Sequence, residues 1–260
     1  MTSVITKPAH LPTRCPEPAV TLSQLCFSYP DRPHVIKNLS LQVAAGQRVG
    51  IIGHNGCGKT TLFMTLCGAY RPSSGEVQLF QQPVVPGQFH HQIGLLFQDP
   101  DDQLFSASVR DDIAFGPLNL GLGDEQIHAR VAAALQLVGI QPLAERPPHH
   151  LSGGEKQMVA IAGLLAMQPR VVLYDEPTAS LDIRSRRRLI NFLQTLDQTM
   201  LIASHDLEFV LEVCDRVLIM HQGEIAADGH PREIMGDEAL MRAYELEKPH
   251  SLVPHVIPHH

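Results

Sequence analysis

The sequence predicts an α/β fold with a mainly parallel central sheet, and three observations support it. An apolar run at 49–52 leads through a glycine-rich turn into a helical segment at 62–67, which is the order strand, loop, helix. Further apolar runs at 92–97, 171–174 and 199–203 have the length and composition of buried strands. Each of these runs ends in polar side chains, as expected where the carboxyl ends of parallel strands form a ligand-binding edge.

Length and composition limit the class of protein. The 260 residues, 44% of them apolar, suffice for one large domain or two small ones. The net charge is −7 and no basic stripe is present, so we expect no nucleic-acid partner. The longest apolar run, 158–167, is too short to span a bilayer. A link to a membrane would therefore require a partner protein. Five cysteines without a C-x-x-C pair are typical of a reducing cytosol.

Both ends of the chain are expected to lie outside the folded domain. Residues 1–19 are rich in proline and have no apolar segment of the kind that a signal peptide needs, which predicts a disordered leader. Residues 246–260 form a tail rich in histidine and proline. This tail and the pair His149 and His150 have two interpretations, binding of Ni²⁺ or Co²⁺ and plain disorder, and composition favours disorder.

The N-terminal part of the domain is predicted to form strands. Segments 20–27 and 35–43 have strand composition, and a turn-rich loop at 28–33 joins them. Tyr29 in this loop is either an exposed loop aromatic or a flat platform on which a nucleobase stacks.

The segment Gly53–Thr61 carries a highly specific motif. Its sequence GHNGCGKTT matches G-x-x-x-x-G-K-[ST] between a strand and a helix, which predicts a P-loop NTPase. The glycines let backbone N–H groups surround phosphate oxygens, and the following helix adds its positive dipole end. Lys59 supplies a charge for the β- and γ-phosphates, and the Thr60 hydroxyl is placed to bind Mg²⁺. The residues predicted to contact ATP here are Gly53, His54, Asn55, Gly56, Cys57, Gly58, Lys59, Thr60 and Thr61.

The middle of the chain adds one polar group and a set of helices. Gln98 follows the apolar run 92–97, either as a simple strand cap or as a ligand of Mg²⁺ or its water. A strand is predicted at 76–80 and helices at 109–115 and 124–138. One face of the second helix is apolar and consists of Ile127, Val131, Ala134, Leu135 and Val138.

A second anion site is predicted at the start of a long helix over 156–167. Ser152 and Glu155 have the spacing of a capping box, S-x-x-E. A capping box does not explain Gly153 and Gly154, which weaken the first helical turn by about 1 kcal/mol each. Because these glycines leave the backbone N–H groups bare, we expect a phosphate-type anion to approach them closely.

Acidic residues follow the buried run 171–174. Asp175 is assigned to the Mg²⁺ shell, and Glu176, which strand alternation points the other way, to orienting and deprotonating water. The alternative, a surface acid pair, is disfavoured by the apolar residues before it. Asp182 is predicted to cap a helix over 183–196. A solvated basic face is expected on that helix, formed by Arg184, Arg186, Arg187 and Arg188.

His205 follows the apolar run 199–203. A lone histidine at a strand end is commonly structural, but here it is the third polar group placed after a buried strand. It is therefore a candidate to donate to a γ-phosphate or to polarise the pair of Glu176 and water. The rest of the chain predicts a helix over 206–214, a hairpin of 216–220 with 224–227, and a last helix over 231–245.

These motifs, in this order, resemble the nucleotide-binding domain of ATP-binding cassette (ABC) proteins over residues 20–245. They are Tyr29, Gly53–Thr60, Gln98, LSGGEKQ at 151–157, Asp175, Glu176, Asp182 and His205. The resemblance implies ATP and Mg²⁺ as cofactors, an N-terminal antiparallel β subdomain, and a helical subdomain at about 99–165. It implies that Tyr29 stacks on adenine and that Thr60, Gln98 and Asp175 bind Mg²⁺.

The same resemblance assigns catalytic roles and a second subunit. Glu176 is then the catalytic base, His205 the switch histidine, and Asp182 part of the D-loop. The resemblance also implies a second ATPase subunit, which is a copy or a paralogue of this chain. The γ-phosphate of the ATP that this second subunit holds is bound by the signature residues Ser152, Gly153, Gly154 and Glu155. The chain departs from the family pattern at Cys57, Ser180 and Ile183, and we expect these changes to be tolerated.

Two segments, 96–105 and 111–122, narrow the resemblance to the ATPase subunit of energy-coupling-factor importers, and most to the cobalt/nickel branch. The resemblance implies a transmembrane coupling subunit, a substrate-binding membrane subunit, and a peripheral place on the cytoplasmic face of the cell membrane. Asp99, Asp101 and Asp102 are expected to pair with basic residues of the membrane subunit, the alternative being a solvated acidic loop. Other interpretations are the ATPase of a vitamin-type or general ABC importer, and a soluble ABC ATPase of iron–sulfur assembly.

Overall fold

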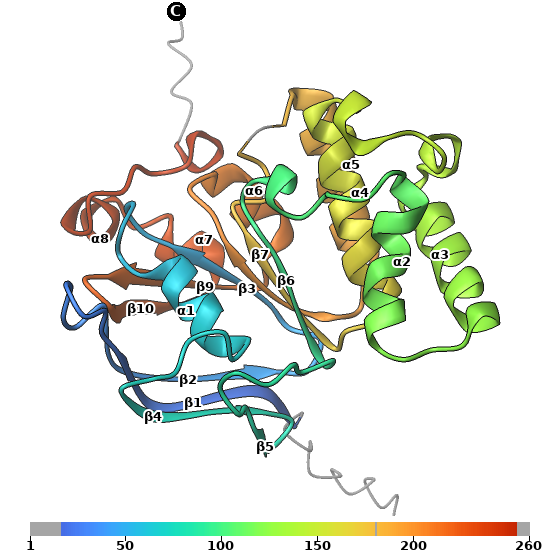
Figure 1. Ribbon diagram of the computed structural model, residues 1–260. Helices are drawn as coiled ribbons and strands as arrows, with labels where there is room; N and C mark the ends of the chain where they lie inside the picture. The colour runs from blue at the N-terminus through green and yellow to red at the C-terminus, as the bar shows by residue number, and fades with distance from the viewer. Residues whose placement is uncertain (1–16, 180, 254–260) are drawn as a thin grey trace, which may run out of the picture.

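The computed structural model describes residues 17–179 and 181–253 as two sheets with helices packed around them (Figure 1). Residues 1–16 of the expected leader, Ser180, and residues 254–260 of the expected tail lie outside these ranges. Strand β1 begins at Pro18, two residues before residue 20, where the sequence predicts that the domain begins.

The central sheet has six strands in the order β10-β9-β3-β8-β7-β6. Neighbours from β9 to β6 pair in parallel, and β9 pairs with β10 as the predicted antiparallel hairpin. The prediction of a mainly parallel sheet is therefore confirmed. The strands are β3 Arg48–Ile52, β6 Ile93–Leu96, β7 Val171–Asp175, β8 Thr199–Ala203, β9 Arg216–His221 and β10 Glu224–Gly229.

A second sheet, in the order β2-β1-β4-β5, is antiparallel and lies below the first in Figure 1. It consists of β1 Pro18–Phe27, β2 Ile36–Ala44, β4 Ser74–Leu79 and β5 Gln82–Pro83. Helix α1, Lys59–Leu66, buries Leu62, Phe63 and Leu66 in one apolar cluster with residues of both sheets. The expected N-terminal antiparallel unit is thus present and holds the helix that follows the glycine-rich loop.

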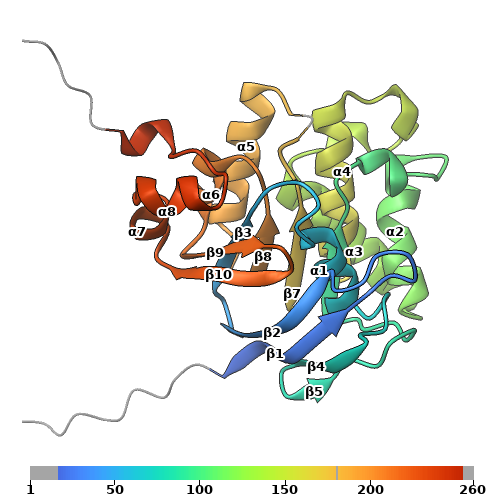
Figure 2. The ribbon, with the colours of Figure 1, turned by 90° about the vertical axis from the view of Figure 1, so that its left-hand side faces the viewer.

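Three helices pack together on the side of the central sheet away from β10, as Figure 2 also shows. They are α2 Val109–Asn119, α3 Asp124–Val138 and α4 Gly153–Ala166. The apolar face predicted for the second of them is the face that α3 buries. Helix α4 begins three residues before the predicted start, because the Ser152 side chain caps it and both halves of the capping box are formed.

The central sheet is apolar on both faces, and side-chain alternation separates two cores. Ile51, Leu173 and Leu201 belong to the cluster that includes α1 and the antiparallel sheet. Tyr174 and Ile202 belong to the cluster with α2 to α4 and with two further helices, α5 Ile183–Gln194 and α6 Leu207–Val213. The polar ends of these strands are consequently held by packing on both sides.

The C-terminal part differs from its prediction in one respect. The prediction of a single helix over 231–245 is wrong. The segment forms two short helices, α7 Pro231–Ile234 and α8 Glu238–Ala243. The second helix starts anew because the Asp237 side chain accepts hydrogen bonds from two backbone amides. A 3₁₀ turn, η4 His250–Leu252, ends the described chain. Across 17–179 and 181–253, no helix combines the length and the apolar character that crossing a bilayer requires.

Candidate functional site

The polar groups that follow four parallel strands meet at one edge of the central sheet. A pocket of about 230 Å³ lies there, between the loop after β3 and the ends of β6 and β7. The predicted residues that line it are Asn55, Gly56, Gly58, Lys59, Thr60, Thr61, Gln98, Asp175 and Glu176. The structure therefore brings most of the predicted phosphate and metal residues to one place.

The loop before α1 is held tightly between neighbouring strands. Gly58 has a φ of 112°, and a Cβ there would lie 2.9 Å from Met220 Cε and 3.0 Å from Val35 O. A glycine is therefore needed both for this left-handed conformation and for the close approach to β9 and the start of β2. This packing fixes the path of the backbone whose N–H groups face the pocket.

The Lys59 ammonium group is positioned by the loop itself. Its Nζ donates to Gly53 O at 2.8 Å and to His54 O at 3.4 Å, and the residue is only 7% exposed. No carboxylate forms an ion pair with Lys59 within 17–179 and 181–253. A buried cation without an anionic partner is costly, so the pocket is suited to a negatively charged ligand such as a phosphate chain.

Thr60 and Asp175 form a second polar pair in the pocket. Thr60 Oγ1 donates to Asp175 Oδ2 at 2.6 Å. Burial raises the pKa of the Asp175 carboxyl, and the nearby charge of Glu176 acts in the same direction, while the Thr60 hydrogen bond opposes them. A buried carboxylate, a hydroxyl and the Gln98 amide oxygen are the hard oxygen donors that suit Mg²⁺.

Glu176 does not follow the alternation of β7, so the prediction that its side chain points away from Asp175 is wrong. Its φ is 48°, in the left-handed region, although its N–H still donates to Ala203 O at 2.9 Å. This turn brings the Glu176 side chain into the same pocket as Asp175. A non-glycine residue in this conformation stores strain, which is common at functional sites.

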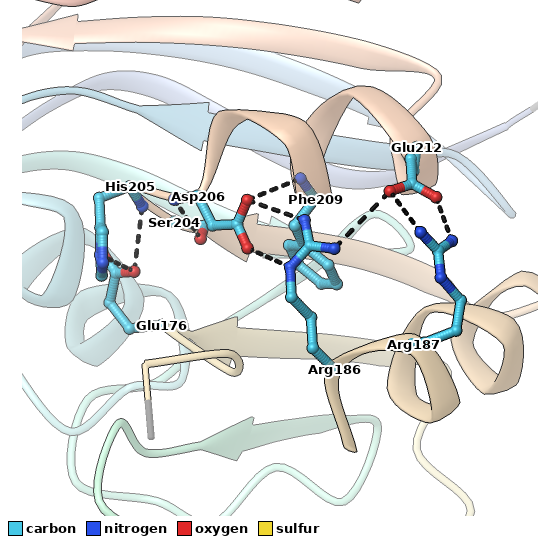
Figure 3. Close-up of polar contacts among 8 residues, drawn as sticks. All are labelled: Glu176, Arg186, Arg187, Ser204, His205, Asp206, Phe209 and Glu212. Carbon is cyan, nitrogen blue, oxygen red and sulfur yellow. Dashed lines mark hydrogen bonds and ion pairs between the residues drawn. The ribbon is translucent and has the colours of Figure 1, made fainter. Parts of the chain in front are cut away.

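Glu176 is joined to His205 by two hydrogen bonds (Figure 3). Its Oε2 accepts from the His205 backbone N–H at 3.0 Å and from ring Nδ1 at 2.7 Å. The second contact assigns the proton to Nδ1, because a carboxylate can only accept. Of the two roles considered for His205, polarising the Glu176 group is the one that this geometry supports.

Four of the residues predicted to contact ATP do not line the pocket, namely Tyr29, Gly53, His54 and Cys57. The Tyr29 hydroxyl is 3.1 Å from Thr61 Oγ1, and its ring packs edge-on against Phe27 and Tyr70. The His54 ring lies against that of His221. Cys57 is buried, and burial raises the pKa of its thiol, so the thiol stays protonated.

The signature residues 152–155 are absent from the lining of the pocket that contains Lys59. Gly154 has a role that the sequence did not reveal: a Cβ there would lie 2.5 Å from Ser185 Oγ and 2.9 Å from Ser185 Cβ. Helices α4 and α5 therefore approach closely at this point, and packing alone requires a glycine. The N-terminus of α4 is exposed at Ser152 and Gly153.

The solvated basic face expected on α5 is confirmed for Arg184, Arg187 and Arg188, which are exposed, and is wrong for Arg186, which is partly buried. Three of the four arginines also have partners within the chain. Arg186 pairs with Asp206, Arg187 pairs with Glu212, and Arg188 donates to Val138 O and Gly139 O. Asp182 caps α5, as predicted, by accepting from Ser185 N at 2.9 Å.

One basic residue of the pocket was missed by sequence reasoning. Arg32 lines it, and its Nη2 donates to Gly56 O at 2.9 Å. Its only signal in the sequence is a cation in the turn after Tyr29, which is an ordinary feature of exposed loops.

A separate groove lies between α1, β6 and the helices α2 and α4. Its volume is about 480 Å³, and its walls are mostly apolar. Phe89, which lines the groove, and Phe105, which packs edge-on against the lining residue Phe115, are each 66% exposed. Asp112 in its wall accepts from Phe105 N and Ser106 N through Oδ1, whereas its buried Oδ2 is without a partner among the described residues.

The acidic segment next to this groove is already partly occupied within the chain. Asp101 pairs with Lys156 at 2.6 Å. Asp99 caps a 3₁₀ turn, η1 Pro100–Asp102, by accepting from Asp101 N. Asp112, which the sequence did not single out, lines the groove with one carboxylate oxygen bonded to two backbone amides and the other oxygen buried.

Known proteins resemble the chain in sequence and in structure. Residues 36–179 match the ABC transporter family. The chain is 60% identical over 235 residues to a Synechocystis protein named as a candidate ABC transporter ATP-binding protein, covering 90% of this chain and 83% of that protein. It is 42% identical over 246 residues to the energy-coupling factor transporter ATP-binding protein EcfA of Methanocaldococcus jannaschii, covering 92% and 88%.

A solved structure agrees with these relatives. The structure of cbiO1 from Clostridium perfringens, described as part of the ABC transporter complex cbiONQ, matches with a TM-score of 0.78 and 37% identity, covering 87% of this chain and 94% of that one. The chain therefore belongs to the ABC transporter family, as an ATP-binding and ATP-hydrolysing subunit of the energy-coupling-factor type.

Proposed function

We propose that two ATPase subunits of this kind close around two ATP molecules and thereby drive a membrane complex that imports cobalt or nickel ions. One observation carries the proposal. The pocket gathers Lys59, Thr60, Asp175 and Glu176, while the second anion site at Ser152–Glu155 lies outside it. A single chain thus holds two complementary halves of a site, and a second subunit, a copy or a paralogue, supplies the missing half.

Within one chain, each pocket residue has a distinct task. Lys59 and the backbone of the glycine-rich loop bind the phosphates, and Arg32 adds a second charge. Thr60, Asp175 and Gln98 would hold Mg²⁺, which neutralises charge on the phosphate oxygens when it is bound. Glu176 accepts the proton of the attacking water, and His205 keeps the Glu176 carboxylate in place.

The second subunit contributes from outside the pocket. The N-terminus of α4 offers backbone N–H groups at Gly153 and Gly154 to the γ-phosphate, with Ser152 beside them. Hydrolysis separates the phosphate from ADP, so this bridge is lost and the like charges of the two products repel. The subunits then part, and Asp182 at the start of α5 lies in the D-loop at their contact.

The groove beside α2 and α4 is where we place the membrane subunit. Exposed Phe89 and Phe105 offer apolar area to a short helix, and the exposed carboxylates of Asp99 and Asp102 fit basic residues on that helix. The protein would then act at the cytoplasmic face of the cell membrane. The metal cargo is supported by the resemblance of segments 96–105 and 111–122 to the cobalt/nickel branch.

Sedimentation of a variant that cannot hydrolyse ATP tests the paired-site proposal. With Mg-ATP, Glu176→Gln should sediment at twice the 28.6 kDa mass of the chain, or pair with its paralogue, and with ADP it should be monomeric. Lys59→Ala is the matched control and should stay monomeric in both. Two results together would contradict the proposal. The Glu176→Gln variant would remain monomeric at saturating ATP, and the wild-type protein would release no phosphate in the presence of its partners.

Metal uptake tests the cargo. Cells that express the complete transporter should accumulate Co²⁺ or Ni²⁺, and cells with Glu176→Gln should not. Accumulation of a vitamin or another nutrient would assign the alternative importer class. A protein that never sediments with membranes would favour the soluble iron–sulfur ATPase.

A further inference from the structure

We propose that Arg186 is a positioning residue for ATP hydrolysis, which acts through Asp206 on His205 and Glu176. The inference rests on the proposed roles of Glu176 and His205. It adds a residue on α5 that contacts neither ATP nor the pocket.

Arg186 and Asp206 form a two-point contact (Figure 3). Arg186 Nε donates to Asp206 Oδ2 at 2.6 Å, and Nη2 donates to Oδ1 at 2.9 Å. Each side chain is 22% exposed, so water screens the pair only partly. A planar guanidinium held at two points fixes direction as well as distance, which a single contact does not.

Because Asp206 is itself held by Arg186, its own hydrogen bonds fix the loop that carries His205. Its Oδ1 accepts from Phe209 N at 2.9 Å and starts α6, and its own N–H donates to Ser204 Oγ at 3.1 Å. Burial acts to raise the pKa of Asp206, but hydrogen bonds from Arg186 and the Phe209 amide outweigh it, so the pKa is lowered and the carboxylate stays ionised. The backbone on both sides of His205 is therefore tied down.

His205 needs such support because its side chain is exposed. The side chain is 63% accessible, so neighbouring side chains do little to restrict its position. Its direction depends on its backbone and on the contact with Glu176. A small displacement of this backbone would lengthen both hydrogen bonds, and misplacement of reacting groups by about 1 Å costs about 100-fold in rate.

The position of Arg186 also connects two loops of the site. Arg186 lies in the first turn of α5, where its N–H donates to Asp182 O at 2.8 Å. Asp182 belongs to the D-loop, which the proposed function places against the second subunit. The chain of contacts Asp182, Arg186, Asp206, His205, Glu176 thus leads from that contact to the catalytic carboxylate.

The neighbouring arginine is a matched control. Arg187 also pairs with an acid on α6, Glu212, which Arg186 approaches only at 3.7 Å. Neither Arg187 nor Glu212 contacts the His205 loop within the described hydrogen bonds. Loss of Arg187 therefore removes an ion pair between α5 and α6 without freeing Asp206.

The experiment compares variants of the full chain for ATP dissociation constant, single-turnover hydrolysis with Mg-ATP, and melting temperature. Arg186→Ala should lower the hydrolysis rate by about tenfold or more with an ATP dissociation constant within about twofold of wild type. Arg186→Lys should recover part of the rate, and Arg187→Ala should hydrolyse at nearly the wild-type rate. If Arg186→Ala does not fold, Asp206→Asn, which can still cap α6, should show the same loss.

A double variant separates this inference from the proposed function. In a His205→Ala background, Arg186→Ala should cause less than about a twofold further loss of rate, because both act through one group. An equal loss in both backgrounds, or a loss in Arg187→Ala as large as in Arg186→Ala, would overturn the inference alone. Wild-type turnover in His205→Ala would instead overturn the proposed role of His205.

Discussion

His205 contacts one oxygen of Glu176 with two different groups, its backbone N–H and its ring Nδ1. This arrangement leaves the other carboxylate oxygen, Oε1, available to the pocket. It also explains why Glu176 leaves the strand geometry, since a left-handed φ of 48° is what turns the side chain toward His205. The pair has the geometry expected of a general base held by an orienting group.

Replacement of Glu176 by Gln should therefore stop turnover without affecting binding. An amide cannot accept a proton from water, so we expect phosphate release to fall by about 100-fold or more. The ATP dissociation constant should stay within about threefold of wild type, since Lys59 and the loop are untouched. Phosphate release and nucleotide titration measure the two quantities, with Glu212→Gln as a control that keeps wild-type turnover. Undiminished release would remove Glu176 from its role.

Asp175→Asn should raise the stability of the protein without ligands while abolishing Mg²⁺-dependent hydrolysis. Because burial raises the pKa of Asp175 in the folded state, ionisation favours unfolding. The protonated Asp175 carboxyl contributes stability that is fully present below pH 3.8, the ordinary pKa of this group. This contribution is lost as pH rises through the raised pKa of the folded state. Asn keeps an oxygen for the Thr60 hydroxyl and carries no charge.

Thermal melts between pH 4 and 7, without Mg²⁺ or nucleotide, would check this sign. At pH 7 we expect Asp175→Asn to melt at least about 2 °C above wild type, a change of about 1 kcal/mol for a domain of this size. The difference should shrink toward pH 4. A lower melting temperature for the variant at neutral pH would show that the ionised carboxylate stabilises the fold.

Gly154→Ala should destabilise the fold through a helix contact, independently of any ligand. A methyl group there would lie 2.5 Å from Ser185 Oγ, so α4 and α5 must move apart, at a cost of about 1–3 kcal/mol. Urea unfolding measures this cost, and Ser185→Gly in the same chain should recover part of it. Gly123→Ala is the control, because nothing lies within 4 Å of a Cβ at that position. Wild-type stability of Gly154→Ala would show that the helices are not in tight contact.

Phe105→Ser should disconnect hydrolysis from transport. Phe105 is exposed and packs edge-on against Phe115, which lines the groove, so its loss should change stability by less than about 0.5 kcal/mol. The purified variant should hydrolyse ATP as wild type does, while cells carrying it in the complete transporter should lose metal uptake. Leu137→Ser, at an apolar site on α3 that is 54% exposed, should keep uptake. Normal uptake with Phe105→Ser would place the membrane contact elsewhere.

Local signals predicted the phosphate loop and the helix caps well. The motif at Gly53–Thr61 depends on backbone conformations that few residues allow, so its glycines identify it directly. The capping box at Ser152 and Glu155 and the cap at Asp182 depend on residues within one helical turn. The pairing of Thr60 with Asp175 followed from parallel strands that end at one edge.

Contacts between distant segments were not predictable in the same way. Glu176 departs from strand alternation because it bonds to a loop 29 residues further along the chain. The arginines of α5 find partners on α3 and α6, and the composition of the run does not reveal them. Arg32 reaches the pocket because a turn folds back onto Gly56.

The sequence by itself thus predicted the chemistry that we propose for this protein: a phosphate loop, a metal carboxylate, a candidate base and a second anion site. These depend on residue types at short spacings, where chain geometry leaves little freedom. The tertiary structure decided which of these groups share a pocket and which arginine of α5 pairs with Asp206, next to His205. Such choices depend on how helices and strands far apart in the chain pack together, and short spacings carry no information about that packing.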